Sequence, residues 1–339
     1  MNSNRSTVGL VTRIGISAAL ALGLAAALAV PGANPAHADG GNRSDLKNFQ
    51  HVFIIMMENT GYTSLIGNPN APWINFAAST YGLATNYFGV SHPSQPNYIA
   101  ATSGSTNGVT NDNDTTINVP NIVDQIEASG RTWKAYMQSL SLCNGNLLAS
   151  SCGNQLYERK HDPFVSYKDV QNNPARMANI VDFSQFATDL ANKTVPDYSW
   201  ISPDQCTDMH GRGGPSTDPC NFGNVQGLIA TGDAFLSSTV NEIMNSSAWN
   251  GNSIIFITWD ESGFPFVDTS GCCDANPGGG HVVMLTISHS DHSARTSSVA
   301  YNHYSMLSTI EGGWQLGCLA FTCDTANVPQ MSDLVGPQG

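Results

Sequence analysis

Short apolar runs, separated by polar segments rich in turn-forming residues, recur along this chain of 339 residues. Five of them have the length and composition of buried β-strands. They cover residues 51–57, 132–137, 198–201, 253–259 and 281–288. Segments with helical patterning alternate with these runs. This alternation predicts an α/β fold with a mainly parallel central sheet and helices on both of its faces.

Three helices are predicted between and after the strands. One is capped by Asn121 and ends near Gly130, a second covers residues 231–248, and a third covers residues 305–316. Their apolar stripes indicate ordinary core packing. The Gly- and Asn-rich tracts at residues 104–114 and 271–280 are predicted to be loops near an edge of the sheet.

The first 38 residues have the pattern of a secretory signal peptide. Arg5 and Arg13 provide a positive start, residues 14–30 are rich in alanine and leucine, and Ala36-His37-Ala38 is typical of a cleavage site. We therefore predict an exported protein with one domain over residues 39–339. No later stretch approaches the roughly 18 apolar residues of a membrane span, so we expect no integral membrane segment after cleavage. A retained N-terminal anchor is the alternative.

The charge balance is strongly acidic. Loss of the predicted signal, which carries Arg5 and Arg13, leaves 11 basic and 26 acidic residues and a formal charge of −15. This balance argues against a nucleic-acid partner, and no protein partner is evident. An anionic substrate would have to be attracted locally, for example by a bound metal cation.

Eight cysteines in an exported chain favour disulfides. Three pairs are close enough in sequence to tie local loops, namely Cys143 with Cys152, Cys206 with Cys220 and Cys318 with Cys323. The adjacent Cys272 and Cys273 either bridge each other or pair elsewhere. A structural zinc site is less favoured because no pair has the common two-residue spacing.

The segment Ser91-His92-Pro93-Ser94-Gln95-Pro96-Asn97-Tyr98 carries the first candidate chemistry. Ser94 lies just ahead of Pro96, and proline favours the start of a helix. Free N–H groups at such a start favour a bound phosphate, so Ser94 is a candidate nucleophile beside an anion site, with Asn97 as a candidate substrate ligand. The alternative is a simple Ser-Pro helix cap.

Hard oxygen ligands follow two of the predicted strands. Glu58 and Asn59 end the first run, and Asp260 and Glu261 end the fourth. In α/β sheets these strand ends form sites, so with Ser94 the four residues predict a cage for a divalent metal ion. The alternative, for either strand alone, is that its carboxylates face solvent.

Other candidates lie after further elements. Asp208 and His210 follow the run at 198–201 and can bind a metal or the substrate, or else belong to a disulfide-fixed surface loop. His161, next to Lys160, is a candidate substrate ligand, although a structural role is slightly favoured. His303 is a candidate general acid or metal ligand, with a buried structural histidine as the alternative.

Several of these blocks, in this order, resemble those of one known family. They are residues 52–59, 94–97, 257–261 and 301–305. The sequence is similar to the bacterial phosphoesterase family of secreted acid phosphatases and phospholipases C, within the alkaline phosphatase superfamily. The resemblance implies metal binding by Glu58, Asn59, Ser94, Asp260 and Glu261, with Ser94 as nucleophile. It also suggests Asp208 and His210 as a pair like that holding a second metal.

This resemblance implies a secreted, metal-dependent phosphoric-ester hydrolase that forms a phosphoserine. Thr60-Gly61-Tyr62 replaces the longer Glu-Asn-Arg-Ser-Phe block of many phospholipases in the family. We therefore favour an acid phosphatase acting on small phosphate monoesters, with a phospholipase C acting on phospholipids as the alternative. More distant alternatives are a metal-independent serine esterase, although Ser94 lacks the flanking glycines of Gly-x-Ser-x-Gly, and a non-catalytic surface-binding protein.

Overall fold

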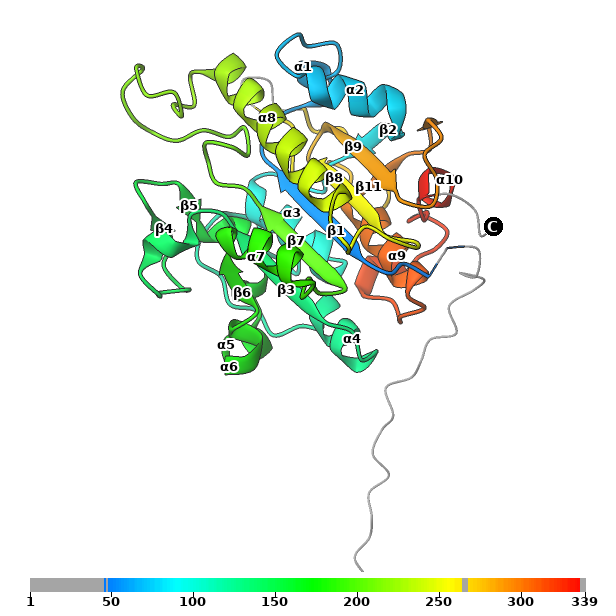
Figure 1. Ribbon diagram of the computed structural model, residues 1–339. Coiled ribbons are helices and arrows are strands. Elements are labelled where there is room, and N and C mark those ends of the chain that lie inside the picture. Colours follow the sequence, from blue (N-terminus) through cyan, green and yellow to red (C-terminus); the bar gives the residue numbers. More distant parts are fainter. Residues whose placement is uncertain (1–45, 47, 264–267, 336–339) are drawn as a thin grey trace, which may run out of the picture. The chain divides into compact units, whose positions relative to one another are not determined.

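A nine-stranded sheet runs through the computed structural model, which describes residues 46, 48–263 and 268–335 (Figure 1). The strand order is β10-β2-β9-β8-β1-β7-β3-β6, and β11 pairs with β2 beside this path. The strands are β1 Val52–Met57, β2 Gly82–Phe88, β3 Trp133–Met137, β6 Ile180–Asp182, β7 Tyr198–Ser202, β8 Ile254–Trp259, β9 His281–Ser288, β10 Arg295–Ser297 and β11 Tyr301–Asn302. A separate two-stranded ribbon joins β4 Ser151–Cys152 to β5 Tyr157–Glu158.

All neighbours in the large sheet are parallel except at β9, which runs antiparallel to both β2 and β8. Val52 is in register with Tyr198 on one side and Ile254 on the other. The carboxyl ends of β1, β2, β7 and β8 therefore meet at one edge, where β9 begins. This arrangement confirms the predicted, mainly parallel α/β fold.

Helices cover both faces of this sheet (Figure 1). On one face α2 and α7 pack against α8, and on the other α3 packs against α9 while α4 joins α9 through a hydrogen bond from Gln125 to Glu311. The longer helices are α2 Pro72–Thr80, α3 Ser94–Ser103, α4 Ile122–Ala128, α7 Ser184–Asn192, α8 Val225–Met244 and α9 His303–Gly313. The shorter ones are α1 Tyr62–Leu65, α5 Lys168–Gln171, α6 Pro174–Met177 and α10 Ser332–Val335, with 3₁₀ turns at Leu140–Cys143, Arg159–His161, Phe164–Ser166 and Ala320–Cys323.

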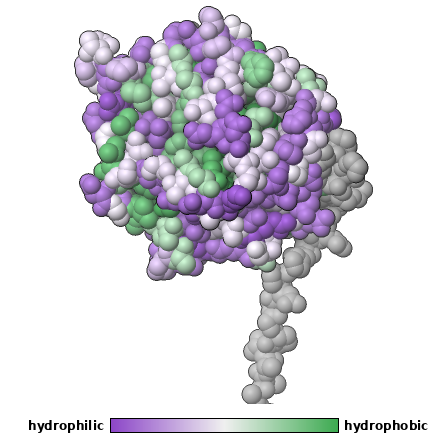
Figure 2. Space-filling view, in the orientation of Figure 1, coloured by the Kyte–Doolittle hydropathy of each residue, from purple (hydrophilic) through white to green (hydrophobic). Residues whose placement is uncertain are grey.

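The surface is largely hydrophilic on the side seen in Figure 2, with apolar side chains in small groups. Among the described residues, the large apolar side chains that stay exposed are Phe76, Leu142, Leu148, Phe222, Val225, Val299 and Phe321. Two of these, Phe222 and Val225, are close in sequence at the start of α8.

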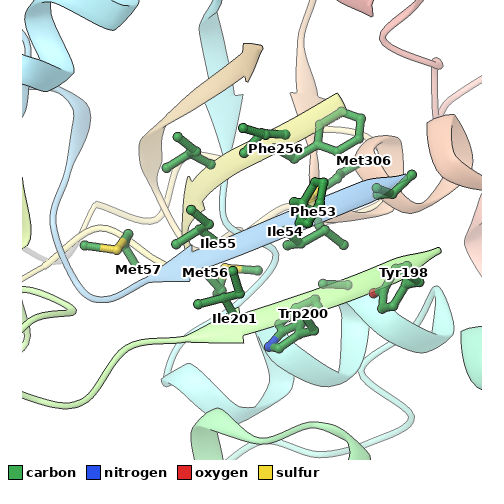
Figure 3. Close-up of a cluster of buried hydrophobic side chains, with 14 of the residues drawn as sticks. Phe53, Ile54, Ile55, Met56, Met57, Tyr198, Trp200, Ile201, Phe256 and Met306 are labelled. Atoms are coloured by element: carbon green, nitrogen blue, oxygen red, sulfur yellow. The ribbon is translucent and has the colours of Figure 1, made fainter. Parts of the chain in front are cut away.

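The central strands form the core. Every residue of β1 is buried, and Figure 3 shows its side chains together with those of β7 and β8 and with Met306 of α9. Because helices cover both faces, both alternating sets of side chains must be apolar. This explains why β1 and β8 are continuous apolar runs in the sequence.

The five predicted strands are confirmed within a residue or two, as is the Asn121-capped helix. Two helix boundaries were predicted wrongly. The helix expected at 231–248 spans Val225–Met244. Its first turns contain Gly227 and Gly232, which do not favour a helix and so hid its start in the sequence. Gly232 is needed for close packing, because a Cβ there would meet the side chain of Met209. The helix expected from residue 305 begins at His303, because the Asn302 side chain accepts hydrogen bonds from the N–H groups of Tyr304 and Ser305.

The disulfide prediction is confirmed. Cys143–Cys152, Cys206–Cys220 and Cys318–Cys323 are paired, and Cys272 bridges its neighbour Cys273. The predicted signal peptide falls outside the described residues. Within the described part of the chain, no helix is both long and apolar enough to span a bilayer.

Candidate active site

Ser94 and Glu58 meet at the edge of the sheet where the parallel strands end. Ser94 is the first residue of α3, and Glu58 directly follows β1. Both side chains are buried, and the Ser94 hydroxyl donates a hydrogen bond of 2.9 Å to Glu58 Oε2. A hydroxyl bonded to a buried carboxylate has the geometry of a nucleophile beside its proton acceptor.

The loop before Ser94 is held by Asn97. Its side-chain oxygen accepts hydrogen bonds from the N–H groups of Val90 at 2.8 Å and Ser91 at 3.0 Å, and its nitrogen donates to Ser91 O at 2.8 Å. The whole amide is thus engaged with the backbone of the loop. These contacts indicate that Asn97 positions the segment carrying Ser94, and its role as a substrate ligand stays a prediction.

Glu58 is a crowded carboxylate. Besides Ser94, the Tyr98 hydroxyl donates to its Oε1 at 2.6 Å, and Nε2 of His161 lies 3.2 Å from the same oxygen. Burial, reinforced by the nearby charge of Asp260, raises the pKa of Glu58 well above its usual range. Glu58 is therefore a better proton acceptor than an exposed glutamate.

Asp260 and Glu261 follow β8 and reach the same place. Asp260 Oδ1 accepts a hydrogen bond of 2.9 Å from the backbone N–H of Asn59. Burial, with the neighbouring charge of Glu261, raises the pKa of Asp260. Ser94 also lies near Asp260, but its proton points to Glu58; among the described residues, Asp260 Oδ2 finds no hydrogen-bond donor.

Asn59 lies between the carboxylates and His210. One polar end of its amide is 3.0 Å from Glu261 Oε1 and 3.2 Å from Asp260 Oδ1, and the other end is 3.2 Å from His210 Nε2. Its backbone φ of 41° is left-handed, which asparagine tolerates better than most residues. Gly263 packs directly on this residue, since a Cβ there would collide with the Asn59 carbonyl.

His303 contacts the backbone of the segment that carries Asp260. The ring is fully buried, its Nε2 lies 2.7 Å from the Asp260 carbonyl oxygen and its Nδ1 lies 3.1 Å from the Tyr87 hydroxyl. Burial lowers the pKa of His303 to about 4. With both nitrogens engaged by protein groups, His303 has the contacts of a positioning residue; a role as general acid stays a prediction without support from this geometry.

Asp208, His210 and His161 form a further group of polar side chains beside Glu58. Asp208 Oδ1 accepts a hydrogen bond of 2.8 Å from the His210 N–H, whereas its Oδ2 lies 3.6 Å from His161 Nδ1. Burial raises the pKa of Asp208 and lowers that of both histidines. The backbone carbonyl of Asp208 accepts a hydrogen bond of 2.8 Å from the Glu58 N–H, which joins this group to the end of β1.

Lys160 supplies a positive charge to the site. Its Nζ is 2.8 Å from Asp112 Oδ2, and it favours the ionised forms of Glu58 and Asp208. Burial lowers the pKa of Lys160, but the charges of Glu58 and Asp112 outweigh burial and raise it. Asp112 also accepts the Gln95 N–H at 2.9 Å, so one N–H at the start of α3 is already occupied.

His92, three residues along the loop from Gly89, is paired with Glu261. The two side chains form an ion pair, and His92 Nε2 lies 2.9 Å from the Asp268 carbonyl oxygen. The hydrogen bond to Glu261 raises the pKa of His92 to about 9. Nothing in the order of residues identifies this partner, because Glu261 is 169 positions away.

The donor set fits a hard divalent cation. Glu58, Asp208 and Asp260 all have raised pKa values, so their ionised forms lack sufficient positive charge nearby. Among the described residues, Asp208 Oδ2 and Asp260 Oδ2 are buried without a hydrogen-bond donor. In the part of the chain described, no three His, Cys, Asp or Glu side chains alone form a ready metal site. A cation here would therefore also need the oxygens of Asn59 and Ser94.

A cleft of about 570 Å³ opens beside these residues. Asn59 and His210 belong both to the site and to the cleft wall. Further lining residues are Thr60, Gly61, Thr63, Ser64, Met209, Phe222, Val225, Ser262, Gly263, Asp268 and His281.

Comparison with known proteins defines the class. A solved protein of the alkaline phosphatase superfamily from Vibrio parahaemolyticus superimposes with a TM-score of 0.54 at 14% identity, covering 87% of this chain and 71% of that one. The two proteins thus share a fold. Residues 68–317 match the Phosphoesterase family, and the chain belongs to this family.

Two relatives are similar over most of this chain. An acid phosphatase of Aspergillus fumigatus is 29% identical over 80% of this chain and 56% of its own length. A phosphatidylinositol-3-phosphatase of Mycobacterium tuberculosis is 29% identical over 86% of this chain and 85% of its own length. The chain thus spans little more than half of the fungal enzyme.

Proposed function

We propose that this protein is a secreted hydrolase of phosphate monoesters, of the acid phosphatase type, with Ser94 as nucleophile. The main observation in support of this proposal is that the buried hydroxyl of Ser94 lies 2.9 Å from Glu58 Oε2 and beside Asp260. Membership of the Phosphoesterase family and the similarity to an acid phosphatase support this choice.

Glu58 accepts the proton when the Ser94 oxygen attacks phosphorus. The bond between phosphorus and the leaving-group oxygen breaks, a phosphoserine forms, and the leaving oxygen takes up the proton from Glu58. Water then gives a proton to Glu58 and attacks the phosphoserine, inorganic phosphate is released, and Ser94 regains its proton from Glu58. Tyr98 holds Glu58 in place through its 2.6 Å hydrogen bond, and Lys160 offsets the charge of the carboxylates around the phosphoryl group.

The proposal includes a divalent cation held by Glu58, Asn59, Ser94, Asp260 and Glu261, with Asp208 as a further ligand. When bound, such an ion would lower the pKa of the Ser94 hydroxyl and stabilise charge on the phosphoryl oxygens. His161 and His210, neutral because burial lowers their pKa values, are the candidate ligands of the phosphoryl group or its leaving oxygen.

The test uses the purified mature chain with p-nitrophenyl phosphate. Ser94→Ala should keep the circular dichroism spectrum and lose at least about 10³-fold in kcat, because it removes the attacking oxygen. Ser103→Ala, which removes a buried hydroxyl at the other end of α3, is the matched control and should stay active. Mass spectrometry of acid-quenched wild-type protein should find phosphate on Ser94.

Other outcomes separate the alternatives. Faster hydrolysis of bis-p-nitrophenyl phosphate or phosphatidylcholine, still dependent on Ser94 and on metal, would indicate a phospholipase C. Hydrolysis of p-nitrophenyl acetate that survives chelation would indicate a serine esterase. Full phosphatase activity in Ser94→Ala would refute the proposal.

A further inference from the structure

We infer that the cleft beside the active site receives the leaving group of the substrate, and that Phe222 and Val225 select a small, apolar, uncharged one. This inference rests on the proposed function and names its substrate class. The first reason is continuity: Asn59 and His210, which lie at the reacting edge, also line the cleft. If the phosphoryl group of the substrate lies between Ser94 and these two residues, its ester substituent can extend into the cleft.

The second reason is the character of the outer wall. Phe222 is 62% exposed and Val225 is 50% exposed, although both are large apolar side chains. Met209, the residue before His210, adds a third apolar side chain to the wall. Burying such surface against an apolar ligand is favourable by about 25 cal/mol per Å².

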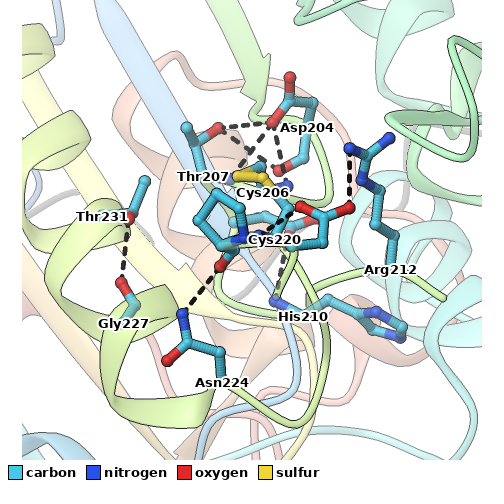
Figure 4. The surroundings of a disulfide bond; sticks show 12 residues. Asp204, Cys206, Thr207, His210, Arg212, Cys220, Asn224, Gly227 and Thr231 are labelled. Atoms are coloured by element: carbon cyan, nitrogen blue, oxygen red, sulfur yellow. Dashed lines mark hydrogen bonds and ion pairs between the residues drawn. A yellow bond between two sulfur atoms is a disulfide. The ribbon is translucent and has the colours of Figure 1, made fainter. Parts of the chain in front are cut away.

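The third reason is that this wall is fixed to the active site. The disulfide Cys206–Cys220 ties the segment around His210 to the start of α8 (Figure 4). Arg212 N donates to Cys220 O at 2.7 Å, and Phe222 N donates to Arg212 O at 3.1 Å.

Gly211 sets the distance between Phe222 and His210. Its φ of 78° is left-handed, and a Cβ there would lie only 2.7 Å from the Cα atom of Phe222. The Phe222 backbone thus packs directly on the residue after His210. A preorganised wall of this kind favours selectivity because little ordering is needed on binding.

Charge excludes a different kind of leaving group. None of the described residues that line the cleft is Lys or Arg, and Asp268 adds a carboxylate. A leaving group with further phosphates would therefore lack a cationic partner there. The volume of about 570 Å³ lies within the usual range for small-molecule sites.

The experiment compares 1-naphthyl phosphate with glycerol 2-phosphate. Phe222→Ala should lower the ratio of their kcat/KM values by about tenfold, since truncation of an apolar pocket costs that order of discrimination. Phe222→Leu should retain most of the ratio. Phe76→Ala, the same change at a 53% exposed phenylalanine on α2 outside the cleft, should leave the ratio unchanged.

A binding measurement on inactive protein distinguishes this inference from the proposed function. In Ser94→Ala protein, calorimetry should give tighter binding of 1-naphthyl phosphate than of inorganic phosphate, and Phe222→Ala should remove this difference. If hydrolysis depends on Ser94 but Phe222→Ala changes neither the ratio nor this difference, the inference is wrong. If the difference depends on Phe222 while wild-type protein hydrolyses neither ester, the proposed function fails and the cleft stands. A preference for phosphatidic acid vesicles over 1-naphthyl phosphate would overturn the restriction to small leaving groups.

Discussion

At the scale of single residues, the site is a set of buried carboxylates with too little positive charge around it. Glu58, Asp208 and Asp260 have raised pKa values because burial and mutual repulsion disfavour ionisation. Lys160 is a cation built into the chain close to this group. Its partners Asp112 and Glu58 could not be predicted from sequence, because they approach it only in the folded chain.

Lys160→Met should weaken binding of phosphate esters. We expect KM for p-nitrophenyl phosphate to rise by about tenfold, with a smaller fall in kcat, because a charge that attracts substrate and transition state alike is lost. Lys160→Arg should recover most of the affinity, and Lys168→Met, at an exposed lysine of α5, serves as control. An unchanged KM with a large loss of kcat would assign Lys160 to the chemical step instead.

Asp162 carries a second prediction at this scale, one of stability. Burial raises the pKa of Asp162 to about 7, from an ordinary value near 3.8. The fold therefore favours the protonated form, and this favourable contribution is lost as pH rises from about 4 to about 7. Asp162→Asn, which keeps an oxygen for the Phe164 N–H, should stabilise the protein by roughly 1–4 kcal/mol at pH 8 and much less at pH 4.

Thermal unfolding of both proteins at the two pH values checks this prediction. The quantity to compare is the difference in Tm between Asp162→Asn and wild type, since other buried carboxylates shift with pH in both proteins. A difference of the same size at pH 4 and pH 8 would mean that Asp162 does not titrate as the structure implies.

At the scale of elements, strand ends decide where the chemistry lies. β1 and β8 could be predicted because strands buried on both faces are continuous apolar runs, and Glu58, Asn59, Asp260 and Glu261 follow them directly. β2 was missed, since Gly82–Phe88 mixes small and polar residues and shows neither a continuous run nor strict alternation. The antiparallel direction of β9 could not be predicted either, because strand direction depends on pairing with β2 and β8.

Contacts between loops were beyond prediction for the same reason. The role of Asn97 in holding the backbone at Val90 and Ser91, and the bond from His303 to the Asp260 carbonyl, arise from how turns fold back on one another. Residue type alone could not predict these positioning contacts.

Gly263 offers a test of one such contact. Gly263→Ala would force a Cβ into the carbonyl of Asn59, so the two loops must separate. We expect a loss of about 1–3 kcal/mol in the free energy of unfolding, together with reduced turnover, because Asn59 lies between Asp260 and His210.

Gly317→Ala is the control for this change, since nothing lies closer than 3.8 Å to a Cβ at that position. Urea unfolding and p-nitrophenyl phosphate assays measure the two effects. Equal behaviour of the two variants would mean that the approach of Gly263 to Asn59 is not needed for the site.

At the scale of the whole molecule, the proposed function requires an acidic protein to bind an anionic substrate. The predicted mature chain has a formal charge of −15, so attraction must come from the site itself, not from the overall field. Lys160 and His92, which pairs with Glu261, are too few to neutralise Glu58, Asp208, Asp260 and Glu261. A bound divalent cation would meet both needs, because it offsets the carboxylates and attracts the phosphoryl group.

Chelation tests this balance through two independent measurements. Dialysis of wild-type protein against EDTA should abolish hydrolysis of p-nitrophenyl phosphate and lower Tm by on the order of 5 °C, because a ligand that binds only the folded state stabilises it. Adding back single divalent ions should restore both. The combined variant Asp260→Asn/Glu261→Gln should have a Tm that no longer responds to EDTA, since neutral amides replace two of the carboxylates that would bind the ion. A chelated wild-type protein that kept its Ser94-dependent turnover and its Tm would show that Lys160 and the protein dipoles suffice, and the predicted metal would have to be abandoned.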